Sequence, residues 1–300
     1  MSGRMLVRIA VALALLVFAW GALAIFRRTS GDAPGGITLP TVTAAELTRI
    51  AVRQGLDSVV VEQEGGGAWR VNGLPAAALT VERFLAALND SASAGELISE
   101  SAQSHERLAV DTVQGRRLTL AAGERTLLDL WVGRRGPDFD GFYVRRAGEE
   151  RVYLLRGAFA EQTALTVEQW RDLQVVRLQP ESIGRIEVMR GGKAWSLSRT
   201  DAGYRLGALA ADSAKARRLF EQVANLRGTA FPDAREPPLR FTPPDRTVRV
   251  LGREGSLLAA LALDSSESGA IWVRREADGL VFKLDARVAE LISPRETDLH

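Results

Sequence analysis

The chain has 300 residues, enough for two domains of ordinary size, and its composition of 46% hydrophobic and 25% charged residues is typical of globular proteins. That composition excludes wholesale disorder, a fibrous repeat and a chain embedded entirely in the membrane. Cysteine is absent, which excludes disulfides, zinc–thiolate sites, iron–sulfur clusters and a cysteine nucleophile. His105 and His300 are the only histidines, so histidine acid–base catalysis could use little besides His105.

The net charge of +2 is unevenly distributed. Residues 1–28 carry four arginines and no acidic residue, which leaves 35 basic and 37 acidic side chains in the rest, a net charge of −2. A nearly neutral body does not favour nucleic-acid binding through bulk charge. We therefore expect no nucleic-acid partner.

The N-terminal segment Ile9 to Phe26 contains 18 residues without a charge or a proline. As a helix it would span about 27 Å, close to the hydrocarbon thickness of a bilayer. A buried core helix would need a polar stripe, which this segment lacks. A cleaved signal peptide is the stronger alternative, because Arg4 and Arg8 precede the segment and Ala22-Leu23-Ala24 resembles a cleavage site. The apolar run is longer than that of most signal peptides, so we predict that residues 1–28 form an uncleaved transmembrane anchor.

The charges flanking this segment indicate its orientation only weakly, because two arginines lie on each side and the α-amino group adds a charge on the first. A single early span followed by a large translocated body is the commoner layout. We therefore expect a single-pass protein of the inner (cytoplasmic) membrane, with its C-terminal body outside the cytoplasm. Residues 29–46 hold Gly, Pro, Ser and Thr without a periodic apolar pattern, which predicts a flexible tether.

An internal repeat follows the tether. One copy begins at Arg49 with RIAVRQGLDSVVVEQEGGGAWRVNG, and the other begins at Arg185 with RIEVMRGGKAWSLSRTDAGYRLGA. Both have the pattern of two alternating strands and a short strand led by an aromatic residue, Trp69 or Tyr204. A repeat of this kind predicts two copies of one supersecondary unit.

An amphipathic helix is expected after the short strand of each copy. Apolar residues recur at helical spacing behind a Thr80 cap in the first copy and behind Asp212 or Ser213 in the second. The matching apolar positions share an offset of 135 residues: Val81/Ala216, Phe84/Leu219, Leu85/Phe220 and Leu88/Val223.

The later strands also match, at an offset of 129 residues, because Phe142-Tyr-Val-Arg-Arg146 corresponds to Ile271-Trp-Val-Arg-Arg275. The predicted fold is α+β: an N-terminal transmembrane helix and two tandem homologous modules, each an antiparallel hairpin-rich sheet packed by one helix. The predicted modules are residues 47–176 and 177–300, with a Thr166/Gln169 capping box near the boundary. The segment between helix and later strands differs most between the copies, which makes it a candidate site of specialisation.

These residues carry a family resemblance. Together with the leading anchor, five short segments resemble the DUF4340 family: Arg49-Ile50-Ala51-Val52, Trp69-Arg70-Val71, Phe142-Tyr143-Val144, Trp170-Arg171-Asp172-Leu173 and Ile183-Gly184-Arg185-Ile186. The resemblance covers residues 47–299. The resemblance implies an envelope protein of unknown function. It also implies an association with ABC-type transport systems of the gliding-motility kind, and it brings no catalytic residues.

The residues themselves offer no catalytic motif. Asp138 and Asp140 begin like a calcium loop, but Tyr143 stands where an EF-hand needs glycine. His105 has no nucleophile motif to serve, and Glu62 and Glu64 fit a solvated hairpin edge better than a glycosidase pair. We expect no catalytic, metal-binding or cofactor-binding residues. Six aromatic residues in strand-like contexts are interpreted as core residues in preference to a sugar-stacking platform: Trp69, Trp131, Trp195, Trp272, Phe142 and Tyr143.

The predicted function is a non-enzymatic, membrane-anchored accessory or scaffold protein of a bacterial envelope complex, with protein partners and with the membrane bound through Ile9 to Phe26. The alternative is a periplasmic ligand-binding module for a cell-wall glycan or peptide, and an envelope hydrolase ranks third. The sequence alone names neither a partner nor a small-molecule ligand.

Overall fold

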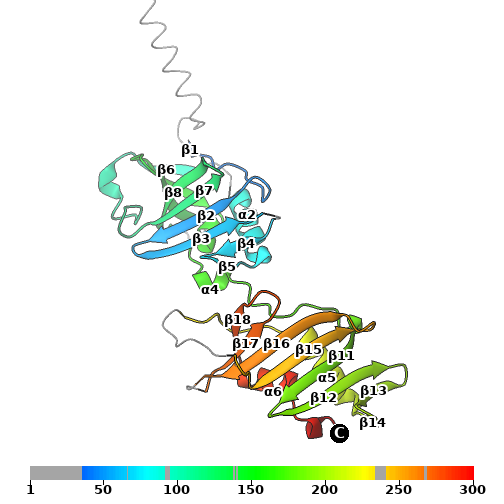
Figure 1. Cartoon of the computed structure of the whole chain (residues 1–300). Helices are drawn as coiled ribbons and strands as arrows, with labels where there is room; N and C mark the ends of the chain where they lie inside the picture. Colours follow the sequence, from blue (N-terminus) through cyan, green and yellow to red (C-terminus); the bar gives the residue numbers. More distant parts are fainter. Residues whose placement is uncertain are drawn as a thin grey trace, which may run out of the picture. The chain divides into compact units, whose positions relative to one another are not determined.

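The structure, a computed structural model, describes residues 36–65, 67–91, 95–137, 139, 141–233, 241–266 and 269–300. These residues are mostly antiparallel sheet with few helices, an α+β architecture (Figure 1). Within these ranges no helix is long and apolar enough to cross a membrane. The predicted anchor, Ile9 to Phe26, and residues 29–35 of the predicted tether lie outside them.

The chain divides into two compact units, here called unit one, which ends at Arg171, and unit two, Asp172 to His300. The division falls slightly before the predicted boundary between residues 176 and 177. Val175 and Val176 belong to unit two because their N–H groups donate to the carbonyl oxygen of Leu226. The expected capping box is confirmed close to the boundary, where the Thr166 N–H donates to Oε1 of Gln169 at 2.8 Å.

Unit one contains one antiparallel sheet, in which the described strands take the order β1-β6-β10-β9-β8-β7-β2-β3-β4-β5. The strands are β1 (Gly36–Ile37), β2 (Arg49–Gln54), β3 (Asp57–Gln63), β4 (Trp69–Val71), β5 (Leu74–Pro75), β6 (Gly95–Ser99), β7 (Arg116–Ala122), β8 (Arg125–Arg135), β9 (Gly141–Arg146) and β10 (Val152–Arg156).

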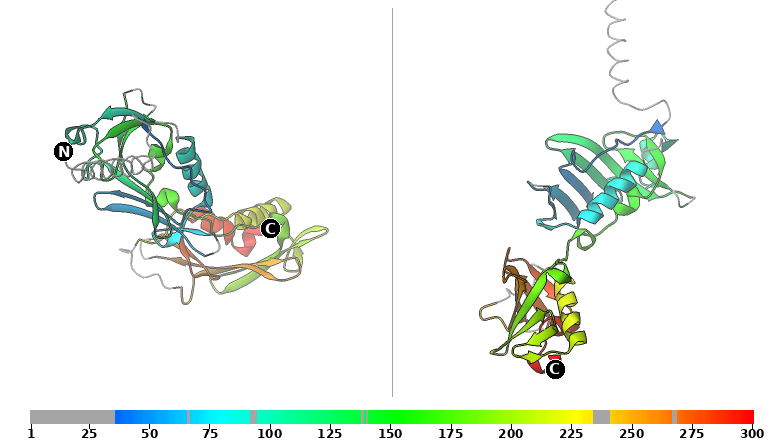
Figure 2. Two further views of the ribbon diagram at one scale, coloured as in Figure 1. Left: turned by 90° about the horizontal axis from the view of Figure 1, so that it is seen from above. Right: turned by 90° about the vertical axis from the view of Figure 1, so that its right-hand side faces the viewer.

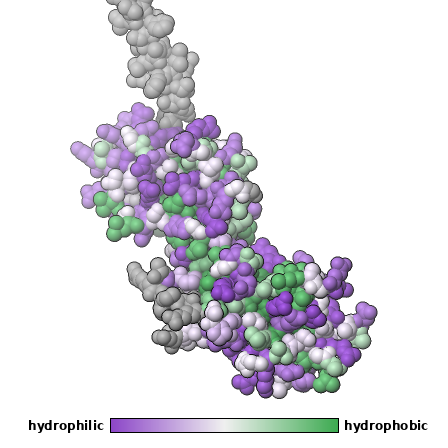
Figure 3. All heavy atoms as spheres, in the orientation of Figure 1, coloured by the Kyte–Doolittle hydropathy of each residue, from purple (hydrophilic) through white to green (hydrophobic). Residues whose placement is uncertain are grey.

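Helix α2 (Ala78–Asp90) lies across one face of this sheet (Figure 2). Its expected apolar stripe is confirmed, since Val81, Phe84, Leu85 and Leu88 are all buried. The short helices α3 (Phe159–Gln162) and α4 (Val167–Trp170) complete the layer, and a 3-10 turn, Ala102–Ser104, precedes β7. The face of unit one in view in Figure 3 is mostly hydrophilic, as expected when the apolar residues lie between sheet and helix.

The predicted Thr80 cap is wrong. Helix α2 begins at Ala78 after an N-cap at Ala77, which provides no side-chain cap. The Ala77 N–H donates instead to the carbonyl oxygen of Trp170 at 2.8 Å. A distant backbone group therefore replaces the local cap, which propensity rules alone cannot anticipate.

The predicted tether is too long at its C-terminal end. Ile37, Leu39 and Val42 are buried in the core of unit one, and β1 pairs with β6. Asn89 of α2 holds the same segment, because its amide accepts from the Val42 N–H at 3.0 Å and donates to the Val42 carbonyl at 2.9 Å. Three scattered apolar residues are enough to dock a segment against a sheet edge, so residues 36–46 belong to this module and not to the tether.

Unit two contains a second antiparallel sheet, in which the described strands take the order β14-β13-β12-β11-β15-β16-β17-β18. The unit also contains helices α5 (Ser213–Ala224) and α6 (Ala286–Ile292). The expected apolar residues of α5 are buried: Ala216, Leu219, Phe220 and Val223. Of the two predicted caps, Asp212 or Ser213, Asp212 is the N-cap of α5 and accepts from two backbone N–H groups. The strands are β11 (Ile183–Arg190), β12 (Lys193–Thr200), β13 (Gly203–Leu206), β14 (Leu209–Ala210), β15 (Arg246–Gly252), β16 (Leu257–Ser265), β17 (Ile271–Arg275) and β18 (Val281–Leu284), and the 3-10 helices are Pro180–Ser182 and Glu296–Leu299.

The two sheets repeat one strand order. Eight strands of each unit correspond, in the order β5-β4-β3-β2-β7-β8-β9-β10 in unit one and β14-β13-β12-β11-β15-β16-β17-β18 in unit two. In both units the long helix follows the same strand, since α2 comes after β5 and α5 after β14. The registers match as well, since Ile50 pairs with Val61 and Leu120, and Ile186 pairs with Leu197 and Val250. Unit one adds β6 and β1 beyond β10.

Described residues of the segment that differs most between the copies pack on the second face of each sheet. In unit one, Leu108 and Val110 form a small buried cluster with Val152, against which Trp131 and Tyr143 pack. In unit two, Phe241 packs with Ala262 and Trp272. Residues 234–240 of this segment lie outside the described ranges.

Gly157, in the connection between β10 and α3, allows the backbone to pass close to Ser91. Its φ is +116°, and a Cβ built there would lie 2.8 Å from the Cβ of buried Ser91, at the end of α2. We expect Gly157→Ala to destabilise unit one by about 3 kcal/mol, because the clash adds to the backbone strain. Gly148→Ala is the matched control, since Gly148 has a φ of +85° but open space around it, and should cost about 1 kcal/mol. Hydrogen–deuterium exchange at α2 in the full chain measures both losses, and equal losses would contradict the clash.

Candidate binding site

A pocket of about 440 Å³ opens in unit one at one end of the sheet. Val52 of β2 pairs with Leu118 of β7, and both side chains face the core. Because side chains alternate along a strand, Gln54 and Arg116, two residues further on, lie on the same face at its end. The chain after α3 closes the other side, so the lining consists of Val52, Gln54, Asp57, Ser58, Val59, Arg116 and residues 163–168.

Arg116 is the unusual member of this pocket. It is half-buried, and burial lowers its pKa. Asp57 and Glu168 line the same pocket, but Arg116 forms no hydrogen bond or ion pair with any residue that the structure describes. Glu168 pairs with Arg171 at 3.4 Å instead. A guanidinium withdrawn from water without a partner is costly, which favours a ligand that supplies the missing acceptor.

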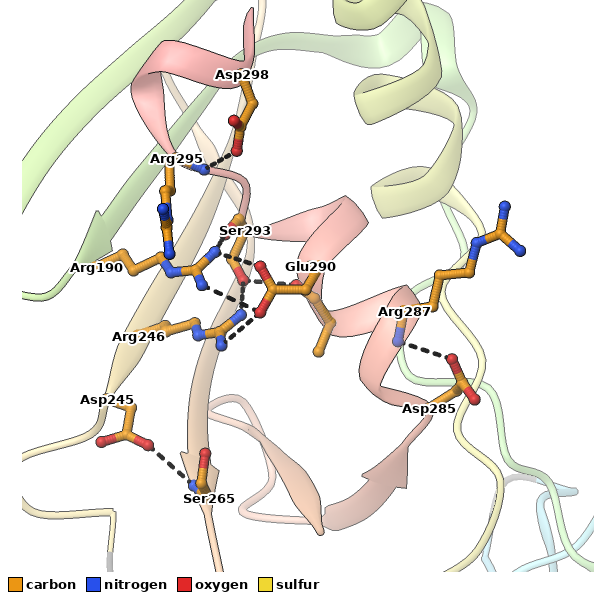
Figure 4. Close-up of polar contacts among 11 residues, drawn as sticks. Arg190, Asp245, Arg246, Ser265, Asp285, Arg287, Glu290, Ser293, Arg295 and Asp298 are labelled. Atoms are coloured by element: carbon orange, nitrogen blue, oxygen red, sulfur yellow. Dashed lines mark hydrogen bonds and ion pairs between the residues drawn. The ribbon is translucent and has the colours of Figure 1, made fainter. Parts of the chain in front are cut away.

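In unit two, the arginine that corresponds to Arg116 is paired with a carboxylate of the same unit. Val188 pairs with Val248 as Val52 does with Leu118, so Arg246 corresponds to Arg116 and Arg190 to Gln54. Glu290 of α6 faces both arginines (Figure 4) and accepts from Arg190 at 2.6 Å and 3.1 Å and from Arg246 at 2.8 Å.

Ser293 completes the cluster in unit two. Its carbonyl oxygen accepts from Arg190 at 2.8 Å, and its hydroxyl accepts from Arg246 at 3.1 Å (Figure 4). In unit one the carboxylate of α3 is used differently, because Glu161 forms an ion pair with Arg135. In unit two a carboxylate of the same unit therefore neutralises the arginine at this position, whereas in unit one the described residues provide no partner for Arg116.

Glu290 should make the stability of unit two depend on acid. Burial raises the pKa of Glu290, but hydrogen bonds from Arg190 and Arg246 outweigh it and hold the pKa below its ordinary value of 4.5. A lowered pKa in the folded state gives stability that is complete above the unfolded pKa and lost as pH falls through the folded one.

We therefore expect the stability of the chain to decline between about pH 5 and pH 3, with part of the decline absent from Glu290→Gln. Urea midpoints of both proteins at pH 6 and pH 3.5 measure this part as a difference, which removes the contribution of other carboxylates. Equal declines in the two proteins would contradict the assignment.

The structure describes three of the residues that the sequence singled out as candidates for catalysis or metal binding: His105, Glu62 and Glu64. Nε2 of His105 lies 2.8 Å from the carbonyl oxygen of Glu150. Glu62 pairs with Arg49 at 3.2 Å and Glu64 with Arg70 at 2.5 Å, as expected for a solvated hairpin edge. Asp138 and Asp140 lie outside the described residues. Elsewhere in the described chain, no group of three or more His, Asp or Glu residues could hold a metal ion.

The expectation that strand aromatics form the core holds for four of the six. Trp69, Trp195, Trp272 and Phe142 are buried. Trp131 and Tyr143 are only half-buried and lie on the second face of the sheet, where the guanidinium groups of Arg117 and Arg145 approach Trp131 at 5.7 Å and 5.8 Å.

Sequence reasoning missed Arg116 and the cluster around Glu290. A signal was present, because Arg116 and Arg246 stand at corresponding positions of the repeat while the residues around them differ. Whether an arginine has a partner depends on side chains up to 100 residues away, as in the pair Arg190 and Glu290.

Comparison with family models matches residues 69–244 to the domain of unknown function DUF4340, more than half of the chain. The chain belongs to the DUF4340 family. The match begins at β4 of unit one and ends just before β15 of unit two, so the DUF4340 domain includes parts of both units. No curated protein and no solved structure matches this DUF4340 protein.

Proposed function

We propose that this DUF4340 protein is a non-enzymatic, membrane-anchored accessory protein of a bacterial envelope complex and that it binds a protein partner through unit one. The observation that carries the proposal is the combination of exposed apolar side chains with the pocket that contains Arg116. Leu56 is fully exposed in the turn before Asp57, and Val113, 78% exposed, lies three residues before Arg116. The two loops are joined, since Nε2 of Gln54 donates to the Gln114 carbonyl at 3.1 Å.

Exposed apolar residues beside a cation without a partner are typical of a contact surface. Unit two supports this interpretation by contrast. The turn that corresponds to Gly55-Leu56 is Gly191-Gly192, because Arg190 pairs with Lys193 as Gln54 pairs with Asp57. The turn of unit two therefore has glycine where unit one has Leu56, and the arginine beside it, Arg246, is paired with Glu290.

We also propose that the units are homologous copies of one module. The shared strand order, the matching registers and the burial of Phe84 with Leu219 and of Leu88 with Val223 support a duplication. Duplication followed by divergence explains why one copy retains a free arginine and the other has neutralised it.

The placement at the inner membrane, with both units outside the cytoplasm, rests on the apolar segment Ile9 to Phe26. Fractionation of the full chain and of a chain lacking residues 1–28 tests the anchor. We expect the full chain in the membrane fraction and the truncated chain in the soluble fraction. A truncated chain that stays with the membrane would contradict the anchor.

Crosslinking in membranes tests the partner. A photoreactive amino acid at position 56 should crosslink to a protein that mass spectrometry identifies as an envelope component, and the family resemblance implies that this is the permease of an ABC-type system. The same substitution at position 192, the corresponding turn of unit two, is the matched control and should give little product. Equal labelling from both positions, or no protein product from position 56, would refute the proposed surface.

The alternative function is a periplasmic ligand-binding module for a cell-wall glycan or peptide. The pocket of about 440 Å³ favours it, because that volume admits a small ligand and Arg116 suits an anionic group. Crosslinks from position 56 to cell-wall material instead of protein would favour this alternative.

A further inference from the structure

We propose that the pocket of unit one binds the side-chain carboxylate of an acidic peptide segment, with Arg116 as its main contact. This inference deepens the proposed function, on which it rests for the origin of the peptide. It names the chemistry of the partner that function requires.

The two units supply the first argument. Glu290 in unit two shows which group satisfies the arginine at this place in the fold: a glutamate carboxylate that accepts from guanidinium N–H groups at 2.6 Å to 3.1 Å. Arg116 occupies the corresponding position on β7 and is left without an acceptor within the described chain. A carboxylate brought by another chain would restore the arrangement of unit two, and planar guanidinium groups match carboxylates in two-point hydrogen bonding.

The remaining lining favours a peptide over a free small anion. The hydroxyl-bearing residues Ser58 and Thr166 line the pocket and can bond to polar groups next to the carboxylate. Leu56 and Val113 are exposed on the adjoining loops, where a small anion would leave them in water. A peptide with apolar residues on either side of its acidic residue would cover them.

Asp57 limits the binding to one kind of anion. It lines the pocket with Arg116, and no hydrogen-bond or ion-pair partner of its side chain is found in the described part of the chain. Its charge disfavours a dianion such as phosphate more than a single carboxylate. The pocket should therefore prefer carboxylates over phosphate.

The test uses the full chain in detergent micelles with ¹⁵N-labelled arginine, and the Nε–H resonance of Arg116 reports on the pocket. The first probe is acetate and the second is a peptide of residues 286–293, ARVAELIS, which contains Glu290 between apolar residues. We expect a saturable shift with acetate and binding at least about tenfold tighter with the peptide. The peptide with glutamine in place of its glutamate should bind at least about tenfold more weakly.

Three variants make the result specific. Arg116→Gln should weaken peptide binding by at least about tenfold, whereas Arg53→Gln should change it less than twofold. Arg53 is the matched control because it is exposed on the neighbouring strand and faces the opposite side of the sheet. Gln54→Glu should place a carboxylate beside Arg116, shift its resonance without ligand and weaken peptide binding.

A phosphate response stronger than that to acetate at equal concentration would overturn the inference, as would peptide binding that Arg116→Gln leaves intact. Crosslinking from position 56 distinguishes the two proposals. A protein crosslink together with an unresponsive Arg116 would retain the proposed function and refute the carboxylate pocket. A responsive Arg116 without a protein crosslink would support the pocket and refute the partner.

Discussion

Replacing Trp170 by alanine should lower the free energy of unfolding of unit one by about 4 kcal/mol. Trp170 is fully buried, and its ring packs on that of Phe84, also fully buried, with 5.7 Å between the ring centroids. Alanine would leave a cavity between α2 and α4 that the sheet behind them cannot fill. It would also disturb the place where the Trp170 carbonyl accepts from Ala77 at the start of α2.

Trp170→Phe is the matched control for this effect. It retains an aromatic ring against Phe84 and removes an indole N–H that is buried without a hydrogen-bond partner in the described structure. We expect it to cost about 1 kcal/mol, because a smaller cavity forms and no hydrogen bond is lost.

Because the chain has two units, a single unfolding curve does not assign the loss to one of them. Hydrogen–deuterium exchange of the full chain, followed by mass spectrometry, gives a separate opening free energy for peptides of each unit. Faster exchange in α2 and β2, with unchanged exchange in α5, is the expected result. A loss below about 1 kcal/mol for Trp170→Ala would show that Trp170 does not hold this layer together.

Glu290→Gln should destabilise unit two by about 2 kcal/mol. The substitution retains the shape of the side chain but removes the charge that Arg190 and Arg246 share. Their side chains are only 20% and 14% exposed, so the two like charges would face each other with little water to screen them. The half-exposed position of Glu290 keeps the expected loss below that of a fully buried pair.

Glu221→Gln is the control for this substitution. Glu221 is exposed on α5, where its side chain has no hydrogen-bond or ion-pair partner among the described residues. Its replacement should change stability by less than about 0.5 kcal/mol. Exchange at α6 and β15 measures both variants, and equal protection in the two would contradict a stabilising role for Glu290.

Glu290→Gln and Arg116→Gln each remove one charge, and we expect different effects on stability in the two units. Loss of the Glu290 charge leaves two arginines of unit two without their carboxylate partner and lowers its stability. Arg116, in contrast, forms no stabilising ion pair with the described residues, so Arg116→Gln should leave the stability of unit one unchanged or slightly raised. That difference is expected if Arg116 serves binding and Glu290 serves folding.

The sequence by itself determined the local elements of this protein and their repetition. Alternating residues such as those of β2 and β11 and the helical spacing of Phe84 and Leu88 depend only on near neighbours, so the pattern is readable from the chain. Asp212 as the cap of α5 and the Thr166/Gln169 capping box are equally local, because each involves residues within three positions.

Tertiary structure decided what depends on residues far apart in the chain. Ile37 joins the core because β6 receives β1, with Gly95 leaving space for its side chain. Helix α2 starts at Ala78 because the carbonyl of Trp170 satisfies its end. Arg246 has a partner because α6 places a carboxylate against the strands. Arg116 has none among the described residues, because in unit one the carboxylate of α3 pairs with Arg135. Periodicity specifies which face of an element is apolar, but the charge that meets an arginine at the end of that face is set by the path of the chain through space.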